Sequence, residues 1–491
     1  MLGHPFHMSA VSEESLDAMD WLLDRFEDDD AVVYAEVGAI DQVKTDLVVT
    51  DDGPRETVSF DETGVCFRVF VEGAADYRYT SSLDEESLTD AADRAVRAAE
   101  FLAQDDPARY DRYTTHRGVH GGWASGSLDA VDLETKVEAV EDALSAADDV
   151  DLDRRWVNYR DAHIESSLAT TTGSTVRTTL DRASARLILE LEDGPTVDRH
   201  AGSTRGAAFL EGLPEVFEDA AADARALSAA EAAPAPTGET TVVLAPRAAG
   251  QLFQFLSRYL EADVGYMGLS PYEVGDEVGP ESIEIEDTVH AGSWAALGYD
   301  AELRPTTPVQ LVEDGTVVRL LHNTVSAAEA GTHPHGNAVP SLGFEQAPRI
   351  HARHLEVAPG NATRAELRDG ADVLVERFDE PWFRDELERV QHSGTMPASV
   401  LYSRTVDRKT EERADRGCAE LPIAEGYRLS DGERAGRVTD VSLDYEPTTL
   451  HGATAVGAAR GTVTGVSEKH KSRLPYAVTA PGVRLEGRLT D

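Results

Sequence analysis

Residues 240–263 read TTVVLAPRAAGQLFQFLSRYLEAD and set the pattern for the second half of the chain. Residues 241–244 are typical of a buried strand, and Ala245 and Pro246 follow at the place where a helix begins. Apolar residues then recur at helical spacing, at Leu252, Phe253, Leu256 and Leu260. This stretch therefore predicts a strand that runs directly into a helix, whose apolar face packs into a core.

The clearest break in the chain lies just before this stretch, where residues 234–238 read PAPTG. Such a run of Pro and Gly is typical of a linker and predicts two domains, residues 1–235 and 236–491. Helical patterns and strand patterns mix in the first domain, with helices expected over residues 12–25, 87–102, 133–146 and 213–232 and strands over 31–37, 46–50, 65–71, 77–80, 153–160 and 186–192. Residues 104–132 are expected to form a long loop.

The predicted fold class is α+β, with a mixed sheet covered by helices on one face in the first domain. The second domain shows many short β-rich runs between Gly, Pro and Asp, which favours a barrel or sandwich. Its expected strands are residues 309–313, 317–321, 350–357, 373–375, 425–429, 438–443 and 483–487.

The charge balance excludes several classes of partner. The chain has 45 Lys and Arg against 91 Asp and Glu, a formal net charge of −46. Repulsion of this size argues against nucleic acid and anionic membranes as partners. Acid spread over the whole length is typical of a halophilic, haloarchaeal protein that works in molar salt, where the Debye length is about 3 Å.

The sequence also shows neither a disulfide framework nor a signal peptide, the two features typical of exported proteins. Cys66 and Cys418 are too few for a disulfide framework, and residues 1–10 show no signal peptide. We therefore expect a cytoplasmic protein with two free thiols.

Several motifs resemble, in order and spacing, those of the TldD/PmbA metallopeptidase family. The matching pieces are GVCFRV from Gly64, the 240–263 stretch with its Leu-Glu-x-Asp end, residues 307–315, residues 321–324, GTHPHGNA at 331–338, APR at 347–349, EGY at 425–427, and residues 465–475. The resemblance implies the family's two-domain fold and a link to proteolysis of extended or unfolded peptides.

The residues that would bind zinc in this family are replaced here. The resemblance implies an H-E-x-x-x-H motif on the helix, and counting from Ala249 and Gly250 places Gln254 at the first His and Phe255 at the Glu. This segment is one residue shorter than the family's, so the second His falls on Arg258 or Tyr259. The family's third ligand is a Cys near the C-terminus, and Ser467 stands at that place.

These replacements remove the chemistry of a zinc peptidase. A catalytic zinc needs three protein ligands and an open water position, and a carboxylate takes the proton of that water. An amide, an aromatic ring and a hydroxyl supply neither the ligands nor the base. We expect no catalytic residue and no metal in this chain, and zinc in a partner subunit.

Three functions remain open at this point. The first is a zinc-less subunit that pairs with a TldD-like catalytic paralogue as a heterodimer, forms part of a peptide channel and supports the zinc-bearing chain. The second is a hydrolase with a relocated metal site at His333 and His335, and the third is a peptide-binding homodimer without catalysis. Gly336 and Asn337 are candidate peptide-binding residues, because the resemblance places them in a substrate-lining loop and Gly admits a close backbone.

His351 and His354 form a second histidine pair in the sequence. Their H-x-x-H spacing puts two rings on one face of a helix, whereas this segment has the pattern of a strand. We therefore expect the two rings to point in different directions.

Overall fold

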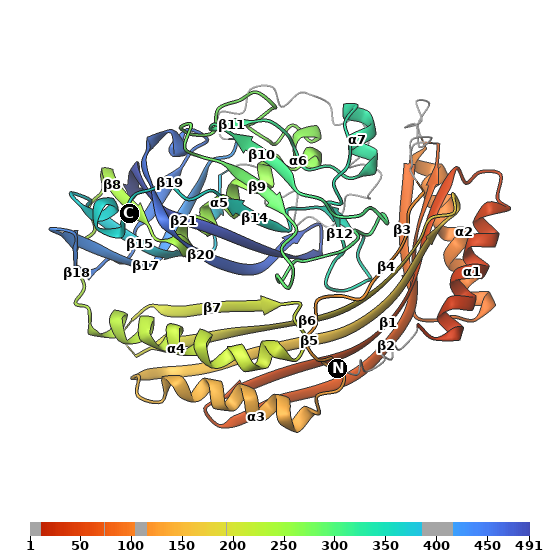
Figure 1. Ribbon diagram of the computed structural model, residues 1–491, viewed down its shortest axis with the longest axis horizontal. Helices are drawn as coiled ribbons and strands as arrows, with labels where there is room; N and C mark the ends of the chain where they lie inside the picture. Colours follow the sequence, from red (N-terminus) through yellow and green to blue (C-terminus); the bar gives the residue numbers. More distant parts are fainter. Residues whose placement is uncertain (1–10, 73, 104–114, 193, 385–415) are drawn as a thin grey trace, which may run out of the picture.

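The computed structural model describes residues 11–72, 74–103, 115–192, 194–384 and 416–491. Figure 1 shows a long curved sheet that wraps around a second, β-rich body, with helices on the outer side of the sheet. The first sheet ends at Ser203, and the strands of the second begin at Gly238. The exact domain boundary at residues 235 and 236 stays a prediction.

The first sheet has seven strands in the order β3-β2-β1-β5-β6-β4, with β7 paired to β6. All neighbours are antiparallel except β4 and β6, so the sheet is mixed, as expected. Its strands are β1 (Tyr34–Thr50), β2 (Gly53–Val71), β3 (Ala74–Thr80), β4 (Arg117–His120), β5 (Leu152–Thr170), β6 (Thr175–Leu191) and β7 (Thr196–Ser203). The helices are α1 (Glu13–Glu27), α2 (Glu85–Leu102), α3 (Leu133–Leu144), the 3-10 turn η1 (Ser145–Ala147) and α4 (Ala208–Ala229).

The two faces of this sheet differ because side chains alternate along a strand. On β6, Ala183, Ala185 and Leu187 enter the core under α3 and α4. The residues that alternate with them, Arg182, Ser184 and Arg186, line a cavity on the opposite face. One face is therefore a hydrophobic core, and the other is a polar wall.

The second domain contains a closed five-stranded barrel. The strands follow the order β21-β19-β17-β15-β8, and β8 pairs back onto β21. Further strands extend this sheet to twelve. The strands of this sheet are β8 (Gly238–Leu244), β9 (Ile285–Thr288), β10 (Val309–Glu313), β11 (Thr316–Val317), β14 (His354–Val357), β15 (Val373–Phe378), β16 (Trp382–Phe383), β17 (Ala419–Ser430), β18 (Glu433–Arg437), β19 (Ser442–Tyr445), β20 (Ala453–Lys469) and β21 (Ser472–Thr490). Strands β12 (Ala338–Val339) and β13 (Arg349–Ile350) pair with each other in a separate two-stranded sheet. The helices are α5 (Pro246–Ser257), η2 (Arg258–Leu260), α6 (Ala262–Tyr266), α7 (Thr324–Ala330), α8 (Arg364–Arg368) and η4 (Thr449–Gly452).

The predicted α+β class and the barrel are confirmed, but several predicted strands were too short. The strands predicted at 31–37 and 46–50 are parts of one strand, β1, which begins at Tyr34 and pairs continuously with β5 from Glu36 to Thr50. The polar residues between them have partners distant in sequence: Ser12 donates its N–H to Asp41 at 2.7 Å, and Lys44 pairs with Glu62.

Two other predictions need correction. Residues 117–120 form β4 inside the predicted loop 104–132, because they pair with β6. Residues 104–114 of that loop lie outside the described residues. In the second domain, the strand expected at 317–321 is reduced to β11, and the one expected at 438–443 begins only at Ser442.

None of the described helices combines the length and apolar character that a membrane crossing needs.

Candidate functional site: an altered metal centre beside a large cavity

Helix α5 carries the replaced zinc positions and packs closely against β20 and β21. Pro246 occupies the first turn, where its missing N–H costs nothing. Gly250 lies at the closest approach, since a Cβ there would stand 2.7 Å from Cγ1 of Val463 on β20. The absence of a side chain at this position lets the helix and the strand meet.

The close approach brings Gln254 and Ser467 together. The Gln254 amide nitrogen donates to the Ser467 hydroxyl at 3.4 Å, and both side chains are buried. Two ligands of one tetrahedral zinc stand roughly 3.5 Å apart, given bonds of about 2.0–2.3 Å. The two positions that the sequence assigned to ligands therefore converge, although they are 213 residues apart.

Phe255 and Tyr259 lie in an aromatic cluster. The Phe255 ring centroid is 4.9 Å from that of Tyr445 and 5.5 Å from that of Tyr259, both in edge-on contact. Tyr259 is fully buried in the core, whereas Arg258 lines the same cavity as Gln254. Of the two candidates for the second His position, Arg258 is thus the one that faces the altered site.

This set of side chains does not fit zinc. At the positions that the resemblance assigns to ligands and base, the described side chains are an amide, a hydroxyl, a guanidinium and an aromatic ring. Zinc in proteins is bound by thiolate, imidazole and carboxylate, and a guanidinium repels it. A carboxylate general base is missing too, because its position is Phe255.

A fully buried ionic network adjoins the altered site. Lys469 on β20 pairs with Glu261 and with Asp263, the latter at 2.7 Å, and donates to the Ile350 carbonyl at 3.0 Å. Glu261 also accepts from His351 Nδ1 at 2.7 Å. The Leu-Glu-x-Asp end of the quoted stretch therefore has a structural role, which sequence reasoning did not find because Lys469 is distant in sequence.

The network shifts the pKa values of its members. Burial opposes the charge of Glu261, but the charges of Lys469 and His351 prevail and lower its pKa. Burial raises the pKa of Asp263, against the pull of Lys469. The pKa of Lys469 is raised, because its two carboxylate partners outweigh its own burial.

The histidine pairs of the sequence do not assemble into one site. His333 is exposed, and His335 Nδ1 lies 3.1 Å from the Thr307 hydroxyl. His351 binds Glu261, whereas His354 points to Ser293 and Thr479, so the two rings face different neighbours.

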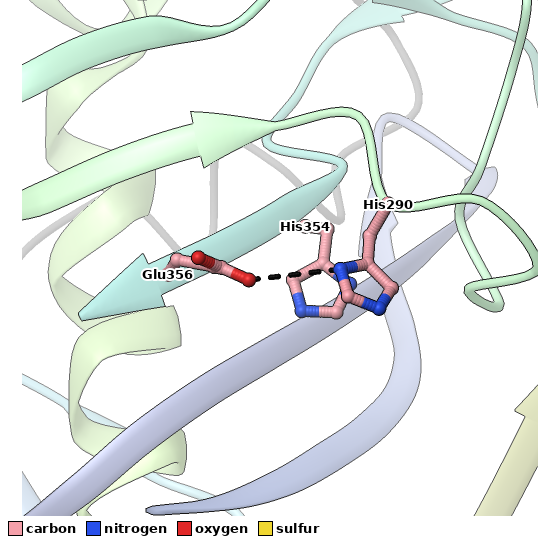
Figure 2. Close-up of side chains that lie close together, drawn as sticks. All are labelled: His290, His354 and Glu356. Atoms are coloured by element: carbon pink, nitrogen blue, oxygen red, sulfur yellow. Dashed lines mark ion pairs between the residues drawn. The ribbon is translucent and has the colours of Figure 1, made fainter. Parts of the chain in front are cut away.

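A different group of potential ligands does come together, as Figure 2 shows: His290, His354 and Glu356. The two rings stack at 4.9 Å, and His290 Nδ1 lies 3.6 Å from Glu356. Both ring nitrogens of His354 already have hydroxyl partners, at 2.7 and 2.9 Å, and Arg460 lies 3.8 Å from Glu356. These contacts satisfy the group without a metal ion.

Gly336 and Asn337 are held inside the second domain. Gly336 has φ +81°, and a Cβ there would stand 2.8 Å from the Thr306 backbone. Asn337 is fully buried and donates to Asp287 at 2.7 Å. The segment that follows, residues 340–346, lines the large cavity. The peptide-binding role of Gly336 and Asn337 stays a prediction.

The cavity has a volume of about 1490 Å³ and lies between the polar face of the first sheet and the altered site. Many of its charges are paired: Arg186 with Asp198, and both Arg199 and Arg377 with Glu425. His200 lies in its wall, where burial lowers its pKa to about 4, so the ring is neutral at neutral pH. Sequence reasoning missed this cavity, because strands from both domains form it.

Comparisons with known proteins agree with this architecture. The family model of the PmbA/TldA metallopeptidase C-terminal domain matches residues 237–381, and that of the family's domain 1 matches residues 35–99. A metalloprotease of Methanothermobacter thermautotrophicus is 24% identical over 482 residues, which cover 94% of this chain and 96% of the relative. A Synechocystis metalloprotease is 31% identical over 231 residues, 44% of this chain and 48% of the relative.

Solved structures show the same fold. A proposed modulator of DNA gyrase from Thermotoga maritima superposes with a TM-score of 0.71 at 18% identity, covering 97% of this chain and all of that one. TldE from Thermococcus kodakarensis gives 0.69 at 13% identity, covering 96% of this chain and all of that one. Family models in both domains, a relative that aligns along nearly the full length and a shared fold lead to one conclusion: the chain belongs to the PmbA/TldD metallopeptidase family.

Proposed function

We propose that this chain is a zinc-less subunit of a TldD-type metallopeptidase, in which a partner with the H-E-x-x-x-H motif holds the zinc. The observation that carries the proposal is the meeting of Gln254 and Ser467 at 3.4 Å beside Phe255. The geometry of a metal centre is kept, but its ligands and base are replaced by groups that satisfy each other. Such a chain contributes structure to a peptidase and leaves catalysis to its partner.

The large cavity supports a role in holding peptide. Its volume of about 1490 Å³ accommodates several residues of an extended chain, and strands form much of its wall. Extended peptides are commonly held through their backbone by strand edges, while pockets read alternate side chains. In this proposal the cavity is one part of the channel in which the partner cleaves unfolded peptides.

An unpaired strand edge supports a partner protein. Strand β3 pairs with β2 only from Val65 to Val71, and no described strand pairs with that edge over residues 53–64. Val58 and Phe60 on this stretch are 47% and 41% exposed. A free edge with apolar side chains is a template for another chain. We assign this edge to the partner subunit, in the cytoplasm of a halophile.

The two alternatives have less support. A relocated hydrolase site at His333 and His335 needs a third ligand, and in the described part of the chain neither histidine belongs to a group of three potential ligands close enough to hold one ion. A peptide-binding homodimer uses the same edge and the same cavity, and the experiment below separates it from the heterodimer.

The test is the subunit composition of the tagged protein, recovered from its own cells in molar KCl. We expect stoichiometric recovery with an H-E-x-x-x-H relative and zinc in that relative. Val58→Lys should reduce the recovery at least tenfold, because it places a charge on the edge. Val119→Lys is the matched control, since Val119 is 64% exposed on β4. Recovery of a lone homodimer overturns the proposal.

A further inference from the structure

Arg182 is a buried cation without a counterion in the wall of the cavity. It lies on the cavity face of β6 and is only 5% exposed. Its Nε and Nη2 atoms lie under the protein surface without a hydrogen-bond partner. Within the described ranges, no carboxylate comes within ion-pair distance of it. A buried charge in this state is costly unless something pairs with it.

The surroundings keep Arg182 charged and in place. Burial lowers the pKa of its guanidinium to about 10, so the group still carries its proton at neutral pH. The guanidinium carbon lies 5.5 Å from the ring centroid of Trp294, in cation–π contact. The indole N–H of Trp294 donates to the Gly465 carbonyl at 2.8 Å, and Gly465 is two residues from Ser467. Trp294 thus joins Arg182 to the strand of the altered metal centre.

Arg186 lies on the same strand and is paired with a carboxylate, so it can be compared directly with Arg182. It follows Arg182 on the same face of β6, and its Nε and Nη2 hold the Asp198 carboxylate at 3.1 and 2.6 Å. In Arg182 the same two donors are unbonded. Arg199 and Arg377 also have a carboxylate, that of Glu425. Arg186, Arg199 and Arg377 thus share one arrangement, guanidinium with carboxylate, and among the described residues Arg182 lacks the carboxylate.

We propose that Arg182 is a carboxylate-binding subsite, and that the terminal carboxylate of a peptide in the cavity fills it. The inference rests on the proposed function only in taking the ligand to be a peptide. A planar guanidinium offers two parallel donors that match a carboxylate, and the proposal requires the side chain to turn these donors toward the cavity when the ligand binds. Because the site is buried, molar salt screens it much less than it screens surface charges.

The test compares three N-acetylated pentapeptides in molar KCl that share otherwise uncharged side chains: a free acid, its amide, and an amide that ends in Asp. Binding to the protein recovered from its own cells is measured by calorimetry. We expect the free acid to bind at least about tenfold more tightly than the amide, as one charge-assisted contact supplies. If the Asp-ended amide binds like the acid, a side-chain carboxylate also fills the subsite, in agreement with the same chemistry.

Two variants locate the effect. Arg182→Gln should remove the difference between acid and amide, because it removes both donors. The double variant Arg186→Gln/Asp198→Asn is the matched control: it removes a cavity arginine whose donors are engaged and keeps the net charge, so the difference should remain. Arg182→Gln removes a buried unpaired charge and should unfold at the same or a higher temperature than the wild type.

Equal binding of acid and amide by the wild type overturns the subsite, as does a difference that survives Arg182→Gln. Neither result bears on the subunit proposal, which recovery of the zinc-bearing partner decides by itself. The converse also holds: a lone homodimer that prefers the free acid keeps the subsite and overturns the subunit proposal.

Discussion

Two neighbouring regions of the second domain are held together in opposite ways. At the altered centre, Gln254, Phe255 and Ser467 are uncharged and pack or bond among themselves. Next to it, Glu261, Asp263 and Lys469 form a fully buried ionic network. We therefore expect the paired charges to contribute more to the stability of the fold than the uncharged contacts.

The largest loss of stability is expected when the cation of the ionic network is removed. Lys469→Met leaves Glu261 and Asp263 buried without their counterion, and we expect a loss of about 3–5 kcal/mol in the free energy of unfolding. Denaturant unfolding in molar KCl measures it. Lys471→Met is the control, because Lys471 is exposed, and it should change stability by no more than about 0.5 kcal/mol. Equal effects of the two variants would falsify a structural role for the network.

The next effect concerns pH and His470, which follows Lys469. Burial, together with the charges of Arg349 and Lys469, lowers the pKa of His470 to about 3. In the unfolded chain the pKa is about 6.5, so the unfolded state binds the proton first as the pH falls. We therefore expect stability to decrease below pH 6.5, with a contribution from His470 of up to about 1.4 kcal/mol per pH unit.

His470→Asn tests this contribution. His470 has φ +51°, and Asn tolerates that backbone conformation without titrating. Unfolding of both proteins across pH 5–7 at constant KCl should show a shallower decrease for the variant. His200, His322 and His354, whose pKa values burial lowers to about 4, should keep part of the slope. An unchanged slope would show that His470 does not take part.

The smallest effect is expected at the altered centre itself. Gln254→Leu combined with Ser467→Ala replaces both hydrogen-bond partners by apolar groups, which is nearly neutral when shapes are similar. The double variant should lie within about 1 kcal/mol of the wild type in denaturant unfolding. The single variant Ser467→Ala, which leaves the Gln254 amide without a partner, should be the less stable of the two. A large loss in the double variant would mean that the uncharged pair, too, is essential to the fold.

The fold could be predicted in class but not in extent. Strand β1 appears in the sequence as two short runs, because Asp41 and Lys44 interrupt its apolar pattern. Both residues find partners only in the folded chain, Asp41 at Ser12 and Lys44 at Glu62. A sequence pattern cannot show such pairs, because the partner of each polar side chain lies far away along the chain.

The candidate site was predictable only where a family pattern marked it. The positions of Gln254 and Ser467 followed from motif spacing, and the structure brings them together. Arg182 carried no local signal, because an arginine in a polar stretch has the pattern of a solvent-exposed residue. Its burial arises from the second domain, whose Trp294 covers it. Such a residue becomes recognisable only after both domains are placed.

The aromatic cluster around Phe255 also has a consequence for redesign. A glutamate at this position would place a charge against Tyr259 and Tyr445, in a space that has closed around a ring. A carboxylate introduced there alone would therefore weaken the protein. A metal site designed on this helix would have to open the packing around Phe255 in the same step that adds the ligands.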